Sequence, residues 1–227
     1  MFAINHAATA LLFKRRYAAV PLVPVLLAVQ AMEFAWVLLN YVGVERTTTE
    51  SEVRYIGDIH LAYMPYSHSV LTVLVAVVLV WALGAAAGRA RLGAILGVAI
   101  LSHLILDVLT HNGDIALGPF ANAPKYGTFL YGRRPLLAFL FELGYGVLCW
   151  RVFRGGWALL AIIVGFNLAN LSLFFPAIPG PEDAMAGRPL LLVTVIFVQI
   201  VVTLWAVWWG AGKSPDRERR DASPAAV

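Results

Sequence analysis

Residues 101–111 read Leu-Ser-His-Leu-Ile-Leu-Asp-Val-Leu-Thr-His and place a histidine and an aspartate, His103 and Asp107, inside a largely apolar stretch that ends at His111. His103 and Asp107 are four residues apart, so their side chains share one face if the stretch is helical. Ionisable groups within a membrane span are costly and rare, and by default they mark a functional site. The stretch therefore predicts a membrane helix and a site carried on it.

The rest of the chain has the composition of an integral membrane protein. Of its 227 residues, 60% are hydrophobic and only 13% are charged, and the mean hydropathy is +0.77. Several apolar runs exceed the roughly 18 residues that suggest a membrane span. We therefore expect an all-α fold, a polytopic transmembrane helical bundle with about six spans. These spans are expected at residues 18–42, 67–87, 92–111, 135–150, 157–175 and 189–210.

A short apolar segment precedes the first expected span. Residues 3–13 are too few to cross a bilayer, so we expect an interfacial or re-entrant helix that carries His6. Residues 1–212 then form a single integral membrane domain. Residues 213–227 are charged and rich in Pro and Ala, which predicts a disordered cytoplasmic tail.

Basic clusters set the expected orientation. Lys14-Arg15-Arg16, Arg89 with Arg91, and Arg151 with Arg154 alternate with the acidic loops 43–66 and 176–188. Cytoplasmic loops carry an excess of Lys and Arg, so both termini are expected to be cytoplasmic. The same rule accounts for the net charge of +4 without a nucleic-acid partner.

Counting depth along the helices brings other polar residues to the level of His103. His103 lies roughly 13 Å below the outer loop, because a helix rises about 1.5 Å per residue. Glu33 and Glu142 lie at a similar depth, and His68 lies at the outer mouth of the second expected span. Carboxylates that converge in a low dielectric need protons or cations. Histidine with carboxylate suits zinc and, less strongly, manganese or iron.

Each of these residues also has a structural explanation. His103 and Asp107 could form a hydrogen bond within one helix that serves folding alone. Glu33 or Glu142 could be a protonated bridge between helices. The convergence of all these groups in the outer half of the membrane favours a functional site.

Two motifs carry a resemblance to a known family. Tyr66-Ser67-His68-Ser69 and Ser102-His103-X3-Asp107-X2-Thr110 are similar to motifs of the YdjM/YbcI-like family, bacterial inner-membrane proteins described as membrane-bound metal-dependent hydrolases. The resemblance covers about residues 1–120. It implies that His6 matches the family's first histidine and that its acidic motif is reduced to Glu33. The first histidine of a further motif is replaced by Tyr63, with His60 three residues away.

This family looks distantly similar to zinc-dependent phospholipase C, which implies phosphoester hydrolysis by analogy. We therefore expect a membrane-embedded hydrolase of the bacterial inner membrane, acting on a phosphoester or lipid-linked substrate in the outer half of the bilayer. The expected metal ligands, for a divalent metal such as zinc, are His6, Glu33, His68, His103 and Asp107. His6 can take part only if residues 1–13 penetrate the bilayer deeply.

Two further residues are candidates for catalysis, Glu142 as a general base or additional ligand and His60 as a loop residue near the motif. His60 could equally be a solvated side chain. Two other functions remain open from the sequence. One is a proton- or metal-coupled transporter, and the other is a non-catalytic membrane protein with a structural metal.

Overall fold

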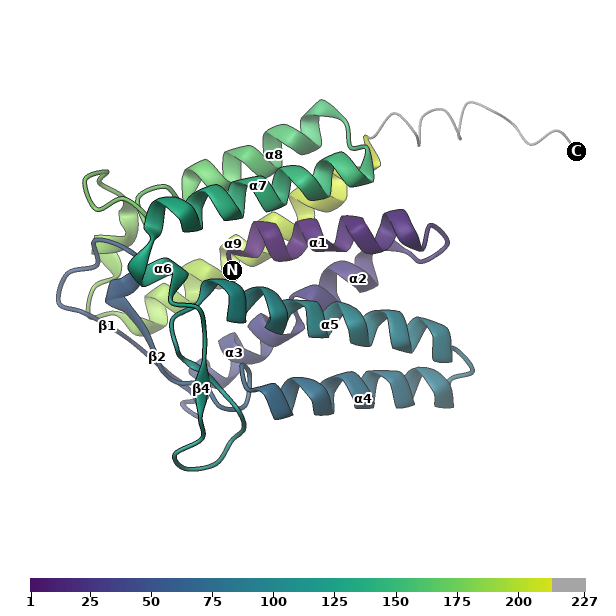
Figure 1. Ribbon diagram of the computed structural model, residues 1–227, viewed down its shortest axis with the longest axis horizontal. Helices are drawn as coiled ribbons and strands as arrows, with labels where there is room; N and C mark the ends of the chain where they lie inside the picture. Colours follow the sequence, from purple (N-terminus) through teal and green to yellow (C-terminus); the bar gives the residue numbers. More distant parts are fainter. Residues whose placement is uncertain (214–227) are drawn as a thin grey trace, which may run out of the picture.

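The computed structural model describes residues 1–213, so the tail expected from residue 213 onward lies outside the described residues except for Lys213. Most of the described chain is helical, which confirms the expected fold class in its main feature. The helices are α1 (Ala3–Arg16), α2 (Leu22–Val29), α3 (Ala31–Tyr41), α4 (Val70–Ala86), α5 (Ala90–Thr110), α6 (Leu130–Arg133), α7 (Pro135–Phe153), α8 (Trp157–Ala169) and α9 (Pro189–Gly212), with the 3-10 helices η1 (Ile56–Asp58) and η2 (Pro181–Met185). The longer helices run roughly alongside one another, and the loops with the strands gather at one end (Figure 1).

Two small antiparallel ribbons lie within segments expected to be plain loops. Strands β1 (Arg46–Thr49) and β2 (Ile59–Tyr63) pair in one ribbon, and β3 (Ile115–Ala116) pairs with β4 (Lys125–Tyr126) in the other. Alternating apolar periodicity is too short in both places to predict strands. Strand β2 contributes Ile59 and Leu61 to the lining of a cavity beside the candidate site.

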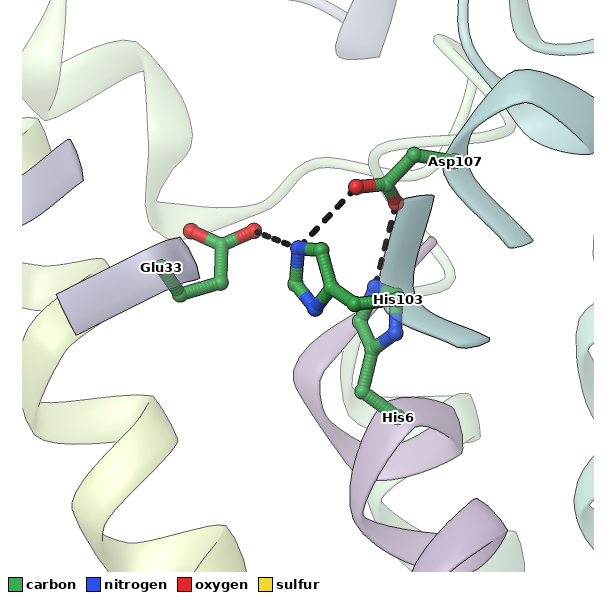
Figure 2. A group of neighbouring side chains, drawn as sticks. All are labelled: His6, Glu33, His103 and Asp107. Carbon is green, nitrogen blue, oxygen red and sulfur yellow. Dashed lines mark hydrogen bonds and ion pairs between the residues drawn. The ribbon is translucent and has the colours of Figure 1, made fainter. Parts of the chain in front are cut away.

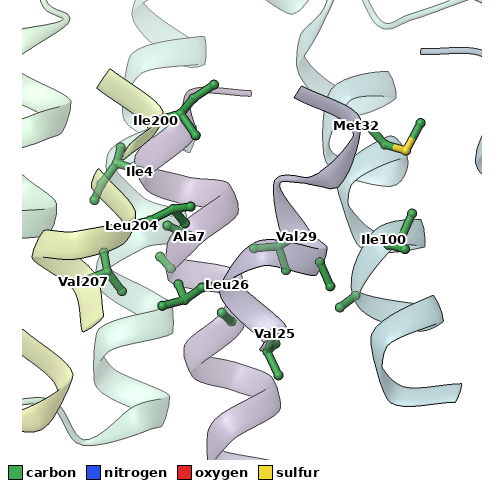
Figure 3. Packing of buried hydrophobic residues seen from close by; sticks show 14 of the residues in the cluster. Ile4, Ala7, Val25, Leu26, Val29, Met32, Ile100, Ile200, Leu204 and Val207 are labelled. Carbon is green, nitrogen blue, oxygen red and sulfur yellow. The ribbon is translucent and has the colours of Figure 1, made fainter. Parts of the chain in front are cut away.

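Helix α1 lies inside the bundle. Its residues from Ile4 to Leu11 are all buried, and it packs against α2, α5, α7, α8 and α9. Three alanines at positions 7, 8 and 10 allow neighbouring backbones to approach closely, as small residues do between membrane helices. Side chains from α1, α2, α5 and α9 meet in the apolar core (Figure 3). The helix therefore brings His6 into the interior.

The first expected span is broken. Residues 18–42 were expected to form one continuous span, but α2 and α3 meet at Gln30 with a bend of 52°. Gln30 has non-helical backbone angles, and its side-chain amide donates to the carbonyl of Ala3 at 2.8 Å. A polar side chain bonded to a neighbouring helix is a recognised way to hold a broken membrane helix.

Three helices are long and apolar enough to cross a membrane, namely α5, α7 and α9, and α2 with α3 makes a fourth if the bent pair is one span. Helices α4 and α8 are apolar but shorter, with 17 and 13 residues. The expected six apolar segments are therefore present among the described residues, but only three or four meet the length of a span. Helices α4 and α5 form a tight hairpin. A Cβ on Gly93 would lie 2.8 Å from the carbonyl oxygen of Val80, so only glycine fits there without a shift.

Candidate metal centre

Five ionisable side chains from four parts of the chain converge in the interior. His6 comes from α1, Glu33 from α3, His68 from the turn before α4, and His103 and Asp107 from α5. All but Glu33 are at most 3% exposed, and Glu33 is partly buried. We call these five residues the His/carboxylate cluster. Figure 2 shows four of them pointing toward one another.

The distances within the cluster are short. His103 Nε2 lies 3.0 Å from Asp107 Oδ2 and 3.3 Å from His68 Nε2. His68 Nε2 also lies 3.7 Å from Glu33 Oε1. The His6 ring stacks on the His103 ring at 3.9 Å between centroids, and its Nε2 lies 3.1 Å from Asp107 Oδ1. One ligand atom from each of His6, Glu33, His103 and Asp107 lies within 4.8 Å of all the others.

Hydrogen bonds outside the cluster fix the proton on His103. Its Nδ1 lies 2.8 Å from the backbone carbonyl of Val29, the last residue of α2. A carbonyl only accepts, so Nδ1 must be the protonated nitrogen. The last carbonyls of a helix have no partner within the helix, and here the break after α2 leaves the Val29 carbonyl free to accept from His103. Neutral His103 therefore presents a lone pair at Nε2.

The same reasoning applies to His68. Its Nδ1 lies 2.8 Å from Ser67 Oγ, which donates its only hydrogen to Glu45 Oε2 at 2.5 Å. His68 Nδ1 must therefore donate to Ser67, which leaves the lone pair at Nε2. Glu45 is 1% exposed and also accepts from the backbone N–H groups of Tyr66 and Ser67. Metal-binding histidines characteristically give their second N–H to such an acceptor.

The carboxylate of Asp107 has one oxygen in use and one without a hydrogen bond. Oδ1 accepts from the α-amino group of Met1 at 2.6 Å and contacts His6. Oδ2 is buried and has no hydrogen-bond partner among the described residues. This oxygen faces the lone pairs of His103 and His68 at 3.0 and 3.7 Å. Three electron-rich atoms thus meet where a cation fits, so the residues present suit a divalent metal.

Glu142 lies beside the cluster with its oxygens occupied. It is fully buried on α7 and accepts from the backbone N–H of Phe2 at 3.2 Å, from Asn5 Nδ2 and from the Tyr131 hydroxyl. Burial, together with the charge of Glu142, raises the pKa of Tyr131 well above its usual range. The structure thus places Glu142 beside the start of α1, where its carboxylate accepts from Phe2 and Asn5.

Two other histidines lie outside the cluster. His60 lies on β2 with a half-exposed side chain and is bonded to Glu50 Oε1 at 2.8 Å, so the structure does not bring it to the cluster. His111 is the residue that ends α5. Its ring lies 3.6 Å from Asp107 Oδ1 and 3.5 Å from Asp114 Oδ1, too far for good hydrogen bonds.

A cavity of about 290 Å³ lies beside the cluster, and Glu33 and His68 are the two cluster residues that line it. Apolar residues of α3 and α9 form much of its wall, including Trp36, Leu192 and Val195. Its polar lining residues include His111, Asn112, Asp114, Tyr131, Asn170, Ser172, Glu182 and Gln199. Among the described residues that line it there is no lysine and no arginine.

The fold and the cluster define a helical membrane protein with a buried site of histidines and carboxylates. The profile of the YdjM inner membrane protein family matches residues 63–177, about half of the chain, and the chain belongs to that family. The resemblance expected from the motifs is confirmed, although the match covers 63–177 rather than 1–120. It includes His68, His103 and Asp107 but not His6 or Glu33. Searches of the curated proteins and of the solved structures find no match.

Proposed function

We propose that this protein is a membrane-embedded hydrolase that depends on a divalent metal, zinc first among them. The ligands would be drawn from His6, Glu33, His68, His103 and Asp107. One observation carries the proposal. Both His103 and His68 give their Nδ1 hydrogens to outside acceptors, while their Nε2 atoms lie 3.3 Å apart beside an unpartnered carboxylate oxygen. Lone pairs and a carboxylate oxygen at such distances repel one another unless a cation lies between them.

The alternative of a purely structural hydrogen bond between His103 and Asp107 agrees less well with this geometry. Such a bond needs a hydrogen on His103 Nε2, but the neutral ring already carries its hydrogen on Nδ1. The ring would have to be a buried imidazolium in contact with the His68 ring. A metal ion satisfies all the facing atoms at once and leaves both histidines neutral.

The roles of the chain's own residues follow from their positions. A divalent metal bound here would supply Lewis acidity and would lower the pKa of a water molecule. Glu33 and His68 form the part of the cluster that lines the cavity, so a substrate would meet the cluster at these two residues. His6 and Asp107 lie behind them, fully buried, and shield that side from bulk water. Ser67 and Val29 hold the two histidines in orientation.

The cavity supports a phosphoester that is attached to lipid. Its lining lacks lysine and arginine among the described residues, and the α-amino group of Met1 is already bonded to Asp107, so a phosphate would take its countercharge mainly from the metal. The apolar wall from α3 and α9 would suit the glycerol and acyl parts of a lipid. We also propose that α2 with α3, α4, α5, α7, α8 and α9 are six spans, with both termini cytoplasmic and the cluster in the outer half of the membrane. The alternating basic and acidic loops support this orientation.

Elemental analysis of detergent-purified protein tests the proposal. We expect zinc or another transition metal in the wild type and its loss in the double variant His103→Ala with Asp107→Ala. Metal-loaded protein should then cleave a phosphodiester or phospholipid and should stop doing so after chelation. Absence of transition metal from wild type after zinc loading would refute the metal site. Metal retained equally by the double variant would refute the ligand assignment.

A further inference from the structure

A buried carboxylate that does not belong to the His/carboxylate cluster also lines the cavity. Glu182 lies on η2 and is 4% exposed. Its Oε2 accepts one hydrogen bond, from Ser172 Oγ at 3.1 Å. Among residues 1–213 no lysine, arginine or histidine forms an ion pair with it. Burial of a lone carboxylate is costly, and a positive charge next to it removes most of that cost.

Gly180 leaves room for the Glu182 carboxylate, and Gln199 gives the cavity a further acceptor oxygen. A Cβ on Gly180 would lie 2.1 Å from Glu182 Oε2 and 2.3 Å from Ser172 Oγ, so any larger residue would displace the pair. Asn170 and Gln199 line the same cavity. Gln199 Nε2 donates to Asn170 Oδ1 at 2.9 Å, and the side-chain carbonyl of Gln199 accepts no hydrogen bond from the described residues. The Glu182 carboxylate and the Gln199 carbonyl are therefore acceptor groups in the lining of one cavity.

Two groups of residues that line the cavity suit opposite charges. With a metal bound, the cluster at Glu33 and His68 would attract an anion, whereas the Glu182 carboxylate would attract a cation. A cavity of about 290 Å³ is at the small end for ligand pockets, large enough for a headgroup but not for a whole lipid. A zwitterionic phosphoester presents both charges within one headgroup.

We propose that Glu182 is the subsite for the ammonium group of a zwitterionic phospholipid headgroup, whose phosphate lies toward Glu33 and His68. This inference rests on the proposed function and names its substrate class. A primary ammonium offers three hydrogens and a full charge, and the Glu182 carboxylate with the Gln199 carbonyl can accept them. A hydroxyl-bearing headgroup would leave the buried carboxylate without a countercharge.

Binding of two matched short-chain lipids tests the subsite. Dihexanoyl phosphatidylethanolamine and dihexanoyl phosphatidylglycerol share the phosphodiester and the chains but differ in ammonium against hydroxyl. We expect zinc-loaded full-length protein in detergent to bind the ethanolamine lipid about tenfold more tightly, the effect of one charge-assisted hydrogen bond. Glu182→Gln should reduce the preference to less than about twofold.

Asp183→Asn is the matched control. Asp183 lies on the same 3-10 helix as Glu182 but is exposed, and its substitution removes one negative charge, as Glu182→Gln does. It should keep the preference of wild type. Gly180→Ala, which displaces the carboxylate by contact, should weaken the preference and carries the test if Glu182→Gln does not fold. Equal binding of the two lipids by wild type, or an unchanged preference in folded Glu182→Gln and Gly180→Ala, would overturn the proposal.

Binding and hydrolysis separate this inference from the proposed function. A Glu182-dependent preference in binding without any metal-dependent cleavage would support the subsite and count against the hydrolase. Metal-dependent cleavage of both lipids at the same rate, with no preference in binding, would support the hydrolase and overturn the subsite.

Discussion

The position of Ser67 predicts that a residue outside the cluster controls metal affinity. Ser67→Ala removes one hydroxyl that accepts from His68 Nδ1 at 2.8 Å and donates to Glu45 at 2.5 Å. Glu45 keeps two backbone donors at 2.8 Å, so its carboxylate stays bonded and the local fold should persist. The change therefore acts mainly on His68.

The expected loss follows from the fate of the His68 hydrogen. If the hydrogen stays on Nδ1, a buried donor lacks its partner, which costs about 1–3 kcal/mol. If it moves to Nε2, the lone pair facing His103 is lost. Either outcome weakens metal binding, and loss of such a supporting hydrogen bond typically lowers metal affinity by roughly 10–100-fold.

Competition of the purified protein with a zinc-binding chromophore measures this loss. Ser69→Ala is the control, because Ser69 is also buried and two residues away but caps α4 by accepting from Thr72. It should lower thermal stability by about 1 kcal/mol and leave zinc affinity unchanged. Zinc affinity of Ser67→Ala within twofold of wild type, or an equal loss in Ser69→Ala, would refute the role given to His68.

Three other changes test the fold and the limits of the site. The pKa of Tyr131 is raised in the folded protein, so above about pH 10 the unfolded chain loses this proton while the folded protein keeps it. The free energy of unfolding should therefore be unaffected by Tyr131 below about pH 10 and should fall by about 1.4 kcal/mol per pH unit above it. Tyr131→Phe should lack this alkaline slope in denaturant unfolding, and identical slopes would show that the Glu142 environment does not hold the phenol neutral. Gly93→Ala should destabilise the α4–α5 hairpin by about 1–3 kcal/mol in thermal unfolding. Gly144→Ala is the control and should be close to neutral, because a Cβ there meets open space. A similar loss of stability in both variants would contradict the tight packing at Gly93. His60→Ala should leave the zinc content of purified protein unchanged, since the half-exposed His60 side chain is bonded to Glu50. Loss of zinc from this variant would show that His60, expected only as a catalytic candidate, contributes to the metal site.

Much of the candidate site could be predicted because helical spacing and depth are readable from sequence. The i, i+4 spacing of His103 and Asp107 predicted a shared face, and the count of residues from the loops predicted that Glu33 and His68 lie at or near their level. The motifs around Ser67 and Ser102 predicted the family.

Other parts of the site depend on tertiary contacts that leave no periodic signal. Glu45 is one of several acidic residues in the 43–66 loop, and only the folded loop brings it to Ser67. Glu142 lies at the predicted depth but points its carboxylate at Asn5 and Tyr131, because these donors satisfy it. Depth alone cannot distinguish a ligand from a buried anchor.

The fold was predictable where apolar runs are long and less so where polar contacts interrupt them. Helices α5, α7 and α9 follow directly from their runs of apolar residues. The break at Gln30 has no Gly or Pro beside it and depends on the bond from Gln30 to Ala3 in α1. The burial of α1 likewise requires partners on five other helices, which a run of 14 residues does not reveal.

The broken helix at Gln30 also limits how this chain can change. A substitution that joined α2 and α3 into one straight apolar helix would insert into a bilayer more readily and satisfy more of its own backbone. The same substitution would draw the Val29 carbonyl into the helix and away from His103. Selection for a better membrane span and selection for a correctly oriented histidine therefore oppose each other at this one turn of the backbone.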